Sequence, residues 1–313
     1  MISDPLPGMT APDSKLEAVF AHLLGMNPDG ARMAAAIRRT FDMLLDGQHT
    51  GRFRWEQLHK TEKTHCGTLI EINLQREFGF ADGEVLDYSI AGSEVDCKYS
   101  QDLADWMIPP EAAGEILLGL WANDHAGRWS AGLVRADQEN LNPGRNRDAK
   151  RTLSKHGRTA IRWLFKDAPL QENVLLRLAD KDIDAIFRPT SGQKRINELF
   201  RRAQGRPISR NVVATVAMQE DYMKRVRGNG GARSALRSEG IVIFGQYRNH
   251  AQAAAALGLP SPGPGEFVSA HLARRRAHHA EAPYLELDGE QWVVATAGDP
   301  IEQVPLLPDI GGL

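Results

Sequence analysis

The chain of 313 residues contains only two cysteines, Cys66 and Cys97, too few for the disulfide framework of a small secreted domain. Its apolar stretches, such as residues 116–122, are much shorter than the roughly 18–20 residues that a membrane-spanning helix needs. The N-terminal residues show no basic segment followed by an apolar one, which is the pattern of a secretory signal. These absences predict a cytoplasmic protein with reduced thiols and no membrane contact.

The composition is that of a folded globular protein. Hydrophobic residues make up 42% of the chain and charged residues 25%, which excludes disordered and collagen-like classes. Because a domain typically holds about 100–200 residues, the length predicts two domains, with one large domain as the alternative. We place an N-terminal arm at residues 1–13, a first domain at 14–165, a linker at 166–171 and a second domain at 172–313.

The two predicted domains differ sharply in charge, although the formal net charge of the chain is only −2. Residues 71–115 contain eleven acidic and two basic side chains, whereas residues 194–237 contain eleven basic and three acidic ones. An acidic block attracts divalent cations and a basic block attracts a phosphate backbone. The same charges would also be found on two ordinary solvated faces, so charge alone leaves both interpretations open.

The first domain mixes helical and extended patterns. Periodicity and turn residues predict helices over 16–45 and 68–78, strands over 85–90, 93–99, 116–122 and 129–134, and a short helix opened by Pro109-Pro110. This order favours an α/β or α+β fold, with a mixed sheet flanked by helices.

A hairpin in this domain brings two acids together. If Ala91-Gly92 forms a two-residue turn, the residue numbers of each facing pair sum to 183. Asp87 then lies opposite Asp96, with both side chains on one face of the hairpin. Like charges in this arrangement are destabilising unless a divalent cation lies between them. Period-two alternation places Lys98 on the face of Asp96, where an ammonium can position a water and offset charge on a phosphate.

The set Asp87, Asp96 and Lys98 matches the PD-(D/E)xK pattern of metal-dependent nucleases, with Leu86 in the place of the proline. A solvent-facing charged hairpin is the alternative interpretation. The tripeptide Asp148-Ala149-Lys150 also contains the short motif, but no strand is predicted around it. Glu71 is a candidate fourth member, although Thr68-x-x-Glu71 also has the spacing of a capping box at a helix N-terminus.

The second domain has the outline of a helix-turn-helix module with a wing. Ile196, Leu199 and Phe200 mark one helix face, residues 211–218 and 221–227 predict two further helices, and residues 241–245 predict a strand. The basic side chains of this region predict DNA contacts, mostly to phosphates. The candidates are Arg201, Arg202, Arg206, Arg210, Lys224, Arg225, Arg227 and Arg233.

Four stretches of the chain closely resemble the NaeI-type restriction endonucleases, which are type IIE enzymes. They are DGQHTGRFRWEQLHKTEKTHCGTLIEINLQREF, LDYSIAGSEVDCKYS, RINELFRR and MKRVRGNGGARS. The resemblance covers nearly the whole chain, from about residue 34 to residue 308. It implies a homodimer of two-domain subunits, with an endonuclease domain followed by a helix-turn-helix-type effector domain.

The resemblance also implies a mechanism and a target. Glu71, Asp87, Asp96 and Lys98 would take the catalytic roles, and the three acids would hold Mg²⁺. The enzyme would bind two copies of double-stranded DNA, cutting one and using the other as an allosteric effector. The expected site is the palindrome GCCGGC, within a restriction-modification system.

Two other functions remain open at the level of the sequence. The chain could be a helix-turn-helix DNA-binding regulator with an inactive nuclease-like domain, in which case metal-dependent cutting would be absent. It could also be a repair or nicking nuclease that recognises lesions or DNA structure, in which case it would not make double-strand breaks at fixed palindromes.

Overall fold

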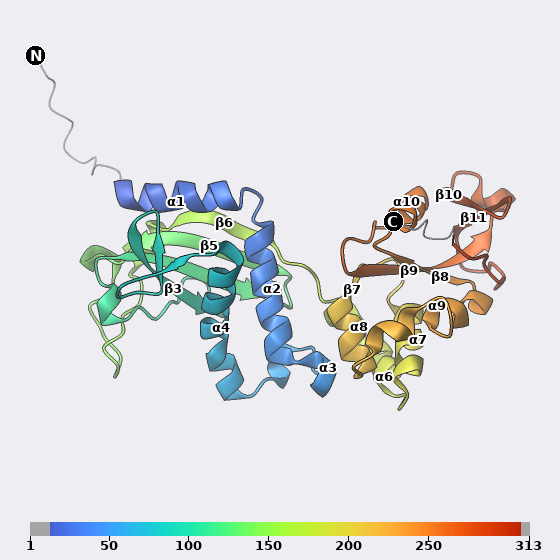
Figure 1. Ribbon diagram of the computed structural model, residues 1–313, viewed down its shortest axis with the longest axis horizontal. Helices are drawn as coiled ribbons and strands as arrows, with labels where there is room; N and C mark the ends of the chain where they lie inside the picture. The colour runs from blue at the N-terminus through green and yellow to red at the C-terminus, as the bar shows by residue number, and fades with distance from the viewer. Residues whose placement is uncertain (1–12, 308–313) are drawn as a thin grey trace, which may run out of the picture. The chain divides into compact units, whose positions relative to one another are not determined.

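A computed structural model describes residues 13–307 of the chain and divides into two compact units (Figure 1). The first unit ends at Leu44 and resumes over His59–Gln171, while the second contains Leu45–Leu58 and everything from Glu172 onward. The N-terminal arm predicted at residues 1–13 lies, apart from Asp13, outside the described residues. The chain thus passes between the units three times, where the sequence predicted a single linker.

The first unit is built on a six-stranded sheet in the order β1-β2-β3-β4-β5-β6. Neighbouring strands are antiparallel except for β3 and β4, which are parallel, so the predicted mixed sheet is confirmed. The strands are β1 (Ala81–Asp82), β2 (Tyr88–Ile90), β3 (Ser93–Ser100), β4 (Ile116–Asn123), β5 (Arg128–Arg135) and β6 (Arg162–Pro169).

Helices flank this sheet, as predicted. They are α1 (Ser14–Met26), α2 (Ala31–Leu45), α4 (Lys60–Phe78) and α5 (Lys155–Thr159), with single 3₁₀ turns at Pro110–Ala112 and Gln138–Asn140. Helix α1 packs against β5 and β6, and α4 packs against β3. The amide of Asn73 on α4 donates to the hydroxyl of Thr40 on α2 at 2.9 Å, which joins the two helices.

The single helix predicted over residues 16–45 is wrong, because α1 and α2 are separated by the turn Asn27-Pro28-Asp29-Gly30. Proline disfavours a helical conformation in the residue before it. Gly30 then takes a φ of +78°, which a side chain would strain. A Cβ there would also lie 3.0 Å from the rings of Phe165 and Trp129, so the turn packs directly on the sheet.

The helix predicted over residues 68–78 begins earlier, at Lys60. Its N-terminus is closed by Glu62, whose carboxylate accepts the backbone N–H of His59 at 2.8 Å. Thr68 therefore lies inside the helix, and the capping-box interpretation of Glu71 is wrong. The predicted C-terminus at Phe78 is confirmed, and Gly79 caps it in the left-handed conformation.

The predicted linker begins too early, because Lys166–Pro169 form the end of β6. This strand is at the edge of the sheet, where the missing N–H of Pro169 breaks no ladder. The carbonyl of Pro169 instead accepts the indole N–H of Trp129 at 3.1 Å. Only Leu170 and Gln171 remain between β6 and the second unit.

The second unit combines short helices with a five-stranded sheet in which β9 pairs with β7, β8 and β11. The strands are β7 (Ile208–Ser209), β8 (Ile241–Gly245), β9 (Glu266–Arg274), β10 (Tyr284–Leu287) and β11 (Glu290–Val294). The α-helices are α3 (Gly47–Thr50), α6 (Asp180–Phe187), α7 (Gly192–Arg202), α8 (Arg210–Ala217), α9 (Ala232–Ala235) and α10 (Arg248–Ala256). The 3₁₀ turns are Trp55–Gln57, Val174–Arg177, Tyr222–Val226, Arg237–Glu239 and Ala277–His279.

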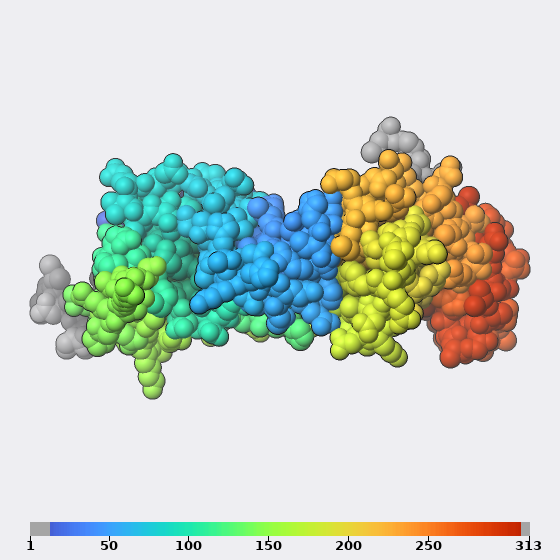
Figure 2. Space-filling model, turned by 90° about the horizontal axis from the view of Figure 1, so that it is seen from below, coloured from blue at the N-terminus to red at the C-terminus, as the bar shows by residue number. Residues whose placement is uncertain are grey.

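The helices of this unit pack on its sheet. Ile196, Leu199 and Phe200 are fully buried on α7, so the predicted helix face is confirmed. Phe267 on β9 belongs to the same hydrophobic core and contacts the ring of Phe200 edge to face. Figure 2 shows the helical part in yellow to orange directly beside the strands β10 and β11 in red. The third helix predicted over residues 221–227 is only a 3₁₀ turn, Tyr222–Val226, and Asp221 gives it no side-chain cap.

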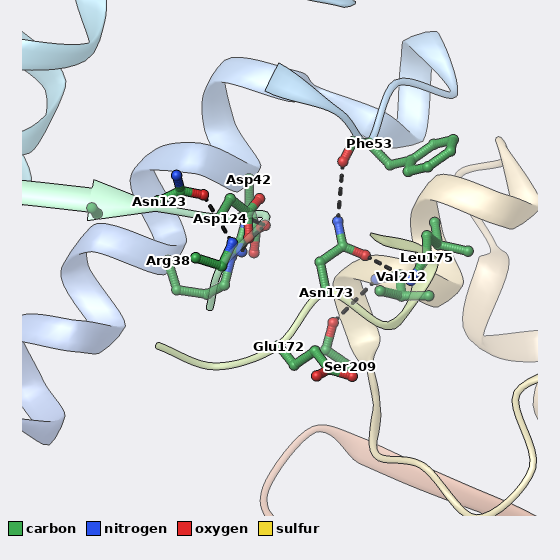
Figure 3. Close-up of polar contacts among 12 residues, drawn as sticks. Arg38, Asp42, Phe53, Asn123, Asp124, Glu172, Asn173, Leu175, Ser209 and Val212 are labelled. Atoms are coloured by element: carbon green, nitrogen blue, oxygen red, sulfur yellow. Dashed lines mark hydrogen bonds and ion pairs between the residues drawn. The ribbon is translucent and has the colours of Figure 1, made fainter. Parts of the chain in front are cut away.

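Residues 45–58, which the sequence assigned to the first domain, belong to the core of the second unit. Phe53 is 6% exposed and stacks on Phe187. The amide of Asn173 donates to the carbonyl of Phe53 and accepts the backbone N–H of Leu175 (Figure 3). A Cβ at Gly47 would lie 2.1 Å from the hydroxyl of Thr215, so the backbone of α3 lies directly against the side chain of Thr215 on α8.

Within residues 13–307, no helix is both long and apolar enough to cross a bilayer.

Candidate active site

The hairpin of β2 and β3 forms with the predicted register. Ile90 pairs with Ser93, Ser89 with Glu94, and Tyr88 with Val95, so the paired residues sum to 183. Ala91 and Gly92 both have positive φ, 50° and 74°, which is the backbone that a two-residue hairpin turn requires. The first strand is shorter than predicted, however, and Asp87 lies just outside the ladder.

Asp87 is held in place by the backbone of the neighbouring strand. Its Oδ2 accepts the N–H of Cys97 at 2.7 Å and lies 3.5 Å from Nζ of Lys98. The side chain remains 22% exposed, so its second oxygen can be reached from solvent. The structure therefore brings Asp87 to Asp96 and Lys98, as the sequence predicted.

Asp96 and Lys98 form a close ion pair, with Nζ of Lys98 at 2.7 Å from Oδ1 of Asp96. Nζ also donates to the carbonyl of Cys97 at 2.8 Å. Burial would lower the pKa of Lys98, but the charges of Asp96 and Asp87 outweigh it and raise the pKa. Lys98 therefore stays an ammonium at neutral pH.

One carboxylate oxygen of Asp96 has no hydrogen-bond partner within residues 13–307. The side chain is only 4% exposed, and its Oδ2 accepts no hydrogen bond from any described residue. Burial raises the pKa of Asp96 to about 6, although Lys98 acts in the opposite direction. The cost of burying this charge is therefore not fully offset within the chain, and a bound cation would offset the remainder.

Glu71 reaches the same site from α4. The hydroxyl of Tyr88 donates to the backbone carbonyl of Glu71 at 2.7 Å, which joins this turn of the helix to the hairpin. Burial, followed by the charge of Asp87, raises the pKa of the Glu71 carboxyl, while Lys98 lowers it. The structure thus gathers all four predicted residues, from α4, the loop before β2, and β3.

The arrangement has the chemistry of a divalent cation site. Mg²⁺ prefers carboxylate oxygens and keeps several of its waters. The unpartnered Oδ2 of Asp96 and the exposed oxygen of Asp87 supply such ligands, and Glu71 lies close enough for their charges to act on it. The competing motif of Asp148 and Lys150 lies in an irregular loop with Ala149 at a φ of 59°, so no comparable cluster forms there.

Sequence reasoning missed the role of Glu94. Its carboxylate accepts the backbone N–H groups of Glu84, Val85 and Leu86, which lowers its pKa. Alternation correctly placed Glu94 on β3 two residues before Asp96, but nothing in the sequence indicated these three bonds. They depend on the path of the irregular loop before Asp87.

Several of the predicted DNA-binding arginines are engaged in ion pairs. Arg201 makes two bonds of 2.7 Å to the carboxylate of Glu239, and Arg202 lies 2.7 Å from Asp182. Arg225 donates to the carboxylate of Asp221. Arg206 lies 3.5 Å from Glu172 but is exposed.

Arg233 is the most buried of these arginines. It donates to the carbonyl of Ile243 and lies over the rings of Tyr247 and Phe267. Burial lowers its pKa, and its buried Nη2 has no hydrogen-bond partner among the described residues. These contacts hold Arg233 against the strands β8 and β9.

The remaining candidates are accessible. Arg210, Lys224 and Arg227 are exposed. Arg210 lies 5.9 Å from the ring centre of Tyr222, and Lys224 is 3.7 Å from Asp221 with 60% of its side chain exposed. Arg227 has no ion pair among the described residues and adjoins the exposed run Gly228-Asn229-Gly230.

A second cluster of ligand-type side chains lies in the second unit, where His278, His279 and Asp299 converge. Each histidine Nε2 lies 3.0 Å from one oxygen of Asp299. The backbone N–H of Arg276 donates to Nδ1 of His279 at 3.1 Å. The proton of neutral His279 must then be on Nε2, where it donates to Asp299, so this nitrogen is not available to a metal.

Comparisons with known proteins show the family of the chain. A sequence model of the family described as restriction endonuclease NaeI matches residues 17–303. The chain is 49% identical to the type II restriction enzyme NaeI of Lentzea aerocolonigenes over 304 residues, 95% of each chain. The chain therefore belongs to the NaeI restriction endonuclease family and is a type II restriction endonuclease, an enzyme that hydrolyses DNA.

Proposed function

We propose that Glu71, Asp87, Asp96 and Lys98 form a magnesium-dependent centre that hydrolyses the phosphodiester bonds of double-stranded DNA. The observation that carries the proposal is the unpartnered, buried Oδ2 of Asp96 beside an ammonium at 2.7 Å from Oδ1. A buried carboxylate is costly unless it is paired or binds a cation. Lys98 already pairs with Oδ1 of Asp96, so a bound cation would pair with Oδ2.

Asp87 and Asp96 would hold the Mg²⁺, and Glu71 would complete its shell directly or through water. When bound, the ion polarises the scissile phosphate and lowers the pKa of a bound water. The bond from the N–H of Cys97 fixes the orientation of Asp87 before DNA binds. Preorganisation of this kind reduces the loss of entropy in the reaction.

Lys98 would act on the attacking water and on the phosphate. Its Nζ is anchored by Asp96 and by the carbonyl of Cys97, and it retains its charge because of the two carboxylates. A fixed ammonium can orient a water for in-line attack and offset the negative charge that develops in the transition state. The products would carry 5′-phosphate and 3′-hydroxyl ends.

The second unit would bind a second copy of the target and activate cutting, as the family likeness implies. Its topology supports a winged helix-turn-helix interpretation. Helix α7, strand β7 and helix α8 are followed by the short helix α9, and β9 then pairs with both β7 and β8. In this interpretation the turns of residues 222–239 occupy the position of a recognition helix.

Arg206, Arg210, Lys224 and Arg227 are the strongest candidates for phosphate contacts, because they are exposed and are not held in close ion pairs. Arg201, Arg202 and Arg225 would have to exchange a carboxylate partner for a phosphate. Arg233 is half-buried and would pack beneath the DNA-binding surface, since it donates to the carbonyl of Ile243.

The target would be the palindrome GCCGGC, cut by a homodimer whose two-fold symmetry matches that of the site. We expect the enzyme to act in the cytoplasm, where its DNA substrate is found. Both expectations follow from the family likeness.

Digestion of a sequenced plasmid tests this function directly. With Mg²⁺ we expect discrete fragments whose ends map to one palindrome, and with EDTA we expect intact plasmid. A duplex oligonucleotide that carries the target should accelerate the cutting of a poorly cut plasmid if the second copy acts as effector. Intact plasmid under all of these conditions, together with specific DNA binding, would favour the DNA-binding regulator with an inactive nuclease-like domain instead.

A further inference from the structure

The carboxylate of Glu94 is surrounded by three consecutive backbone N–H groups. Oε1 accepts from Glu84 at 2.8 Å, and Oε2 accepts from Val85 at 3.1 Å and from Leu86 at 2.8 Å. Both oxygens are thus used. Hydrogen bonds to a charged acceptor are roughly twice as strong as those between neutral groups.

These three residues form the loop that leads directly into Asp87. Residues 83–87 have no regular secondary structure, and the ladder with β3 begins only at Tyr88. The loop turns tightly at Gly83, where a Cβ would lie 2.3 Å from the carbonyl oxygen of Leu86 and 2.9 Å from Oε2 of Glu94. The loop is therefore held by its hydrogen bonds to Glu94, because it has no ladder hydrogen bonds to the sheet.

We propose that Glu94 is a positioning residue that fixes the loop of residues 84–86 and so presents Asp87 to the metal. This role rests on the proposed function, and it adds a residue that acts through Asp87 without touching the ion. Among the described residues, the side chain of Asp87 accepts one backbone N–H, that of Cys97. This bond does not hold the loop before Asp87, so the loop can move once Glu94 is removed. Groups that orient a ligand in this way typically contribute about 10–100-fold to metal affinity or activity.

The variant Glu94→Gln tests the role. Its amide keeps one acceptor oxygen, but its NH₂ group would face a backbone N–H, so at least one of the three bonds is lost. We expect the Kd for Mn²⁺, followed by the electron paramagnetic resonance of free Mn²⁺, to rise about 10–100-fold. The Mg²⁺ concentration for half-maximal plasmid cutting should rise in parallel, and high Mg²⁺ should restore cutting.

Glu84→Gln is the matched control. It changes a carboxylate in the same loop whose backbone N–H, but not its side chain, takes part in the contact. We expect the Mn²⁺ affinity and the Mg²⁺ dependence of this variant to equal those of the unmodified protein.

A second variant covers the case in which Glu94→Gln fails to fold. Gly83→Ala removes no carboxylate but forces the loop to move, because its Cβ would lie 2.3 Å from the carbonyl oxygen of Leu86. It should raise the Kd for Mn²⁺ in the same way. Unchanged affinity in a folded Glu94→Gln, or in a folded Gly83→Ala if the first does not fold, would overturn the positioning role. If the unmodified protein binds no Mn²⁺ and cuts no DNA, the proposed function itself fails.

Discussion

Asp87 accepts the backbone N–H of Cys97 at 2.7 Å, although it lies one residue beyond the last ladder pair of its hairpin. The carboxylate of Asp87 accepts a backbone N–H of the neighbouring strand β3, as a strand carbonyl would in a regular ladder. The bond fixes one oxygen of Asp87 and leaves the other accessible. This is the geometry that a metal ligand needs.

Replacement of Lys98 should separate binding from chemistry. We expect Lys98→Ala to reduce the rate of cutting by a factor of about 10²–10³ or more, because a fixed charge at the phosphate is lost. Specific DNA binding, measured by gel shift with Ca²⁺, should persist. Lys150→Ala, in the competing motif, is the control and should cut normally. Specific binding lost together with cutting in a folded Lys98→Ala protein would show that its role is misassigned.

Metal binding should weaken in acid. Because burial raises the pKa of Asp96 to about 6, a proton competes with the cation below that pH, whereas the carboxylate is ionised above it. We expect Mn²⁺ affinity to be level above about pH 7 and to fall by up to about tenfold per pH unit below about pH 6. Mn²⁺ titrations at pH values on both sides of the pKa of Asp96, with circular dichroism as a check of folding, measure this pH dependence. A flat affinity across this range would contradict the account.

The buried ion pair of Arg38 and Asp124 should be important for stability. Both side chains are 7% exposed, and Arg38 also lies 2.9 Å from Asp42 (Figure 3). Because Arg38→Ala leaves a carboxylate buried without its partner, we expect the free energy of unfolding to fall by about 3–5 kcal/mol. The neighbour Arg39, in an exposed pair with Glu77, serves as control. Arg39→Ala should cost at most about 1 kcal/mol by urea denaturation. Equal losses would exclude the special role of burial.

The salt dependence of DNA binding should identify the phosphate contacts. If about six phosphates are neutralised, log affinity should fall against log salt with a slope near −5. Arg227→Ala should make the slope shallower by about one, because its charge is exposed and unpaired among the described residues. Arg202→Ala should change it less, since Asp182 and Glu198 already offset that charge. A slope near zero for the unmodified protein would refute the basic surface as a DNA site.

Local sequence patterns were sufficient for the core of the candidate site. The positive-φ pair Ala91-Gly92 sets the hairpin register, and period two then places Asp96 and Lys98 on a common face. The turn residues Asn27-Pro28-Asp29-Gly30 also indicate the break between α1 and α2. The helical pattern on both sides of them led to the prediction of one continuous helix. These features depend on contacts between residues close in the chain.

What could not be predicted depends on contacts between distant residues. Residues 45–58 belong to the second unit because Phe53 packs against Phe187 and bonds to Asn173. Likewise, no pattern near Arg201 indicates Glu239, which neutralises it from 38 residues away. Composition indicates that residues 194–237 carry a net positive charge. The tertiary fold decides which of these side chains are paired with carboxylates and which are available to DNA.

The most direct test of the central claim is the anomalous scattering of crystals of the protein soaked in Mn²⁺. The account predicts a peak within coordination distance of Oδ2 of Asp96 and of the exposed oxygen of Asp87, absent in Asp96→Asn. No peak at this position at saturating Mn²⁺, or a peak only at His278, His279 and Asp299, would contradict it.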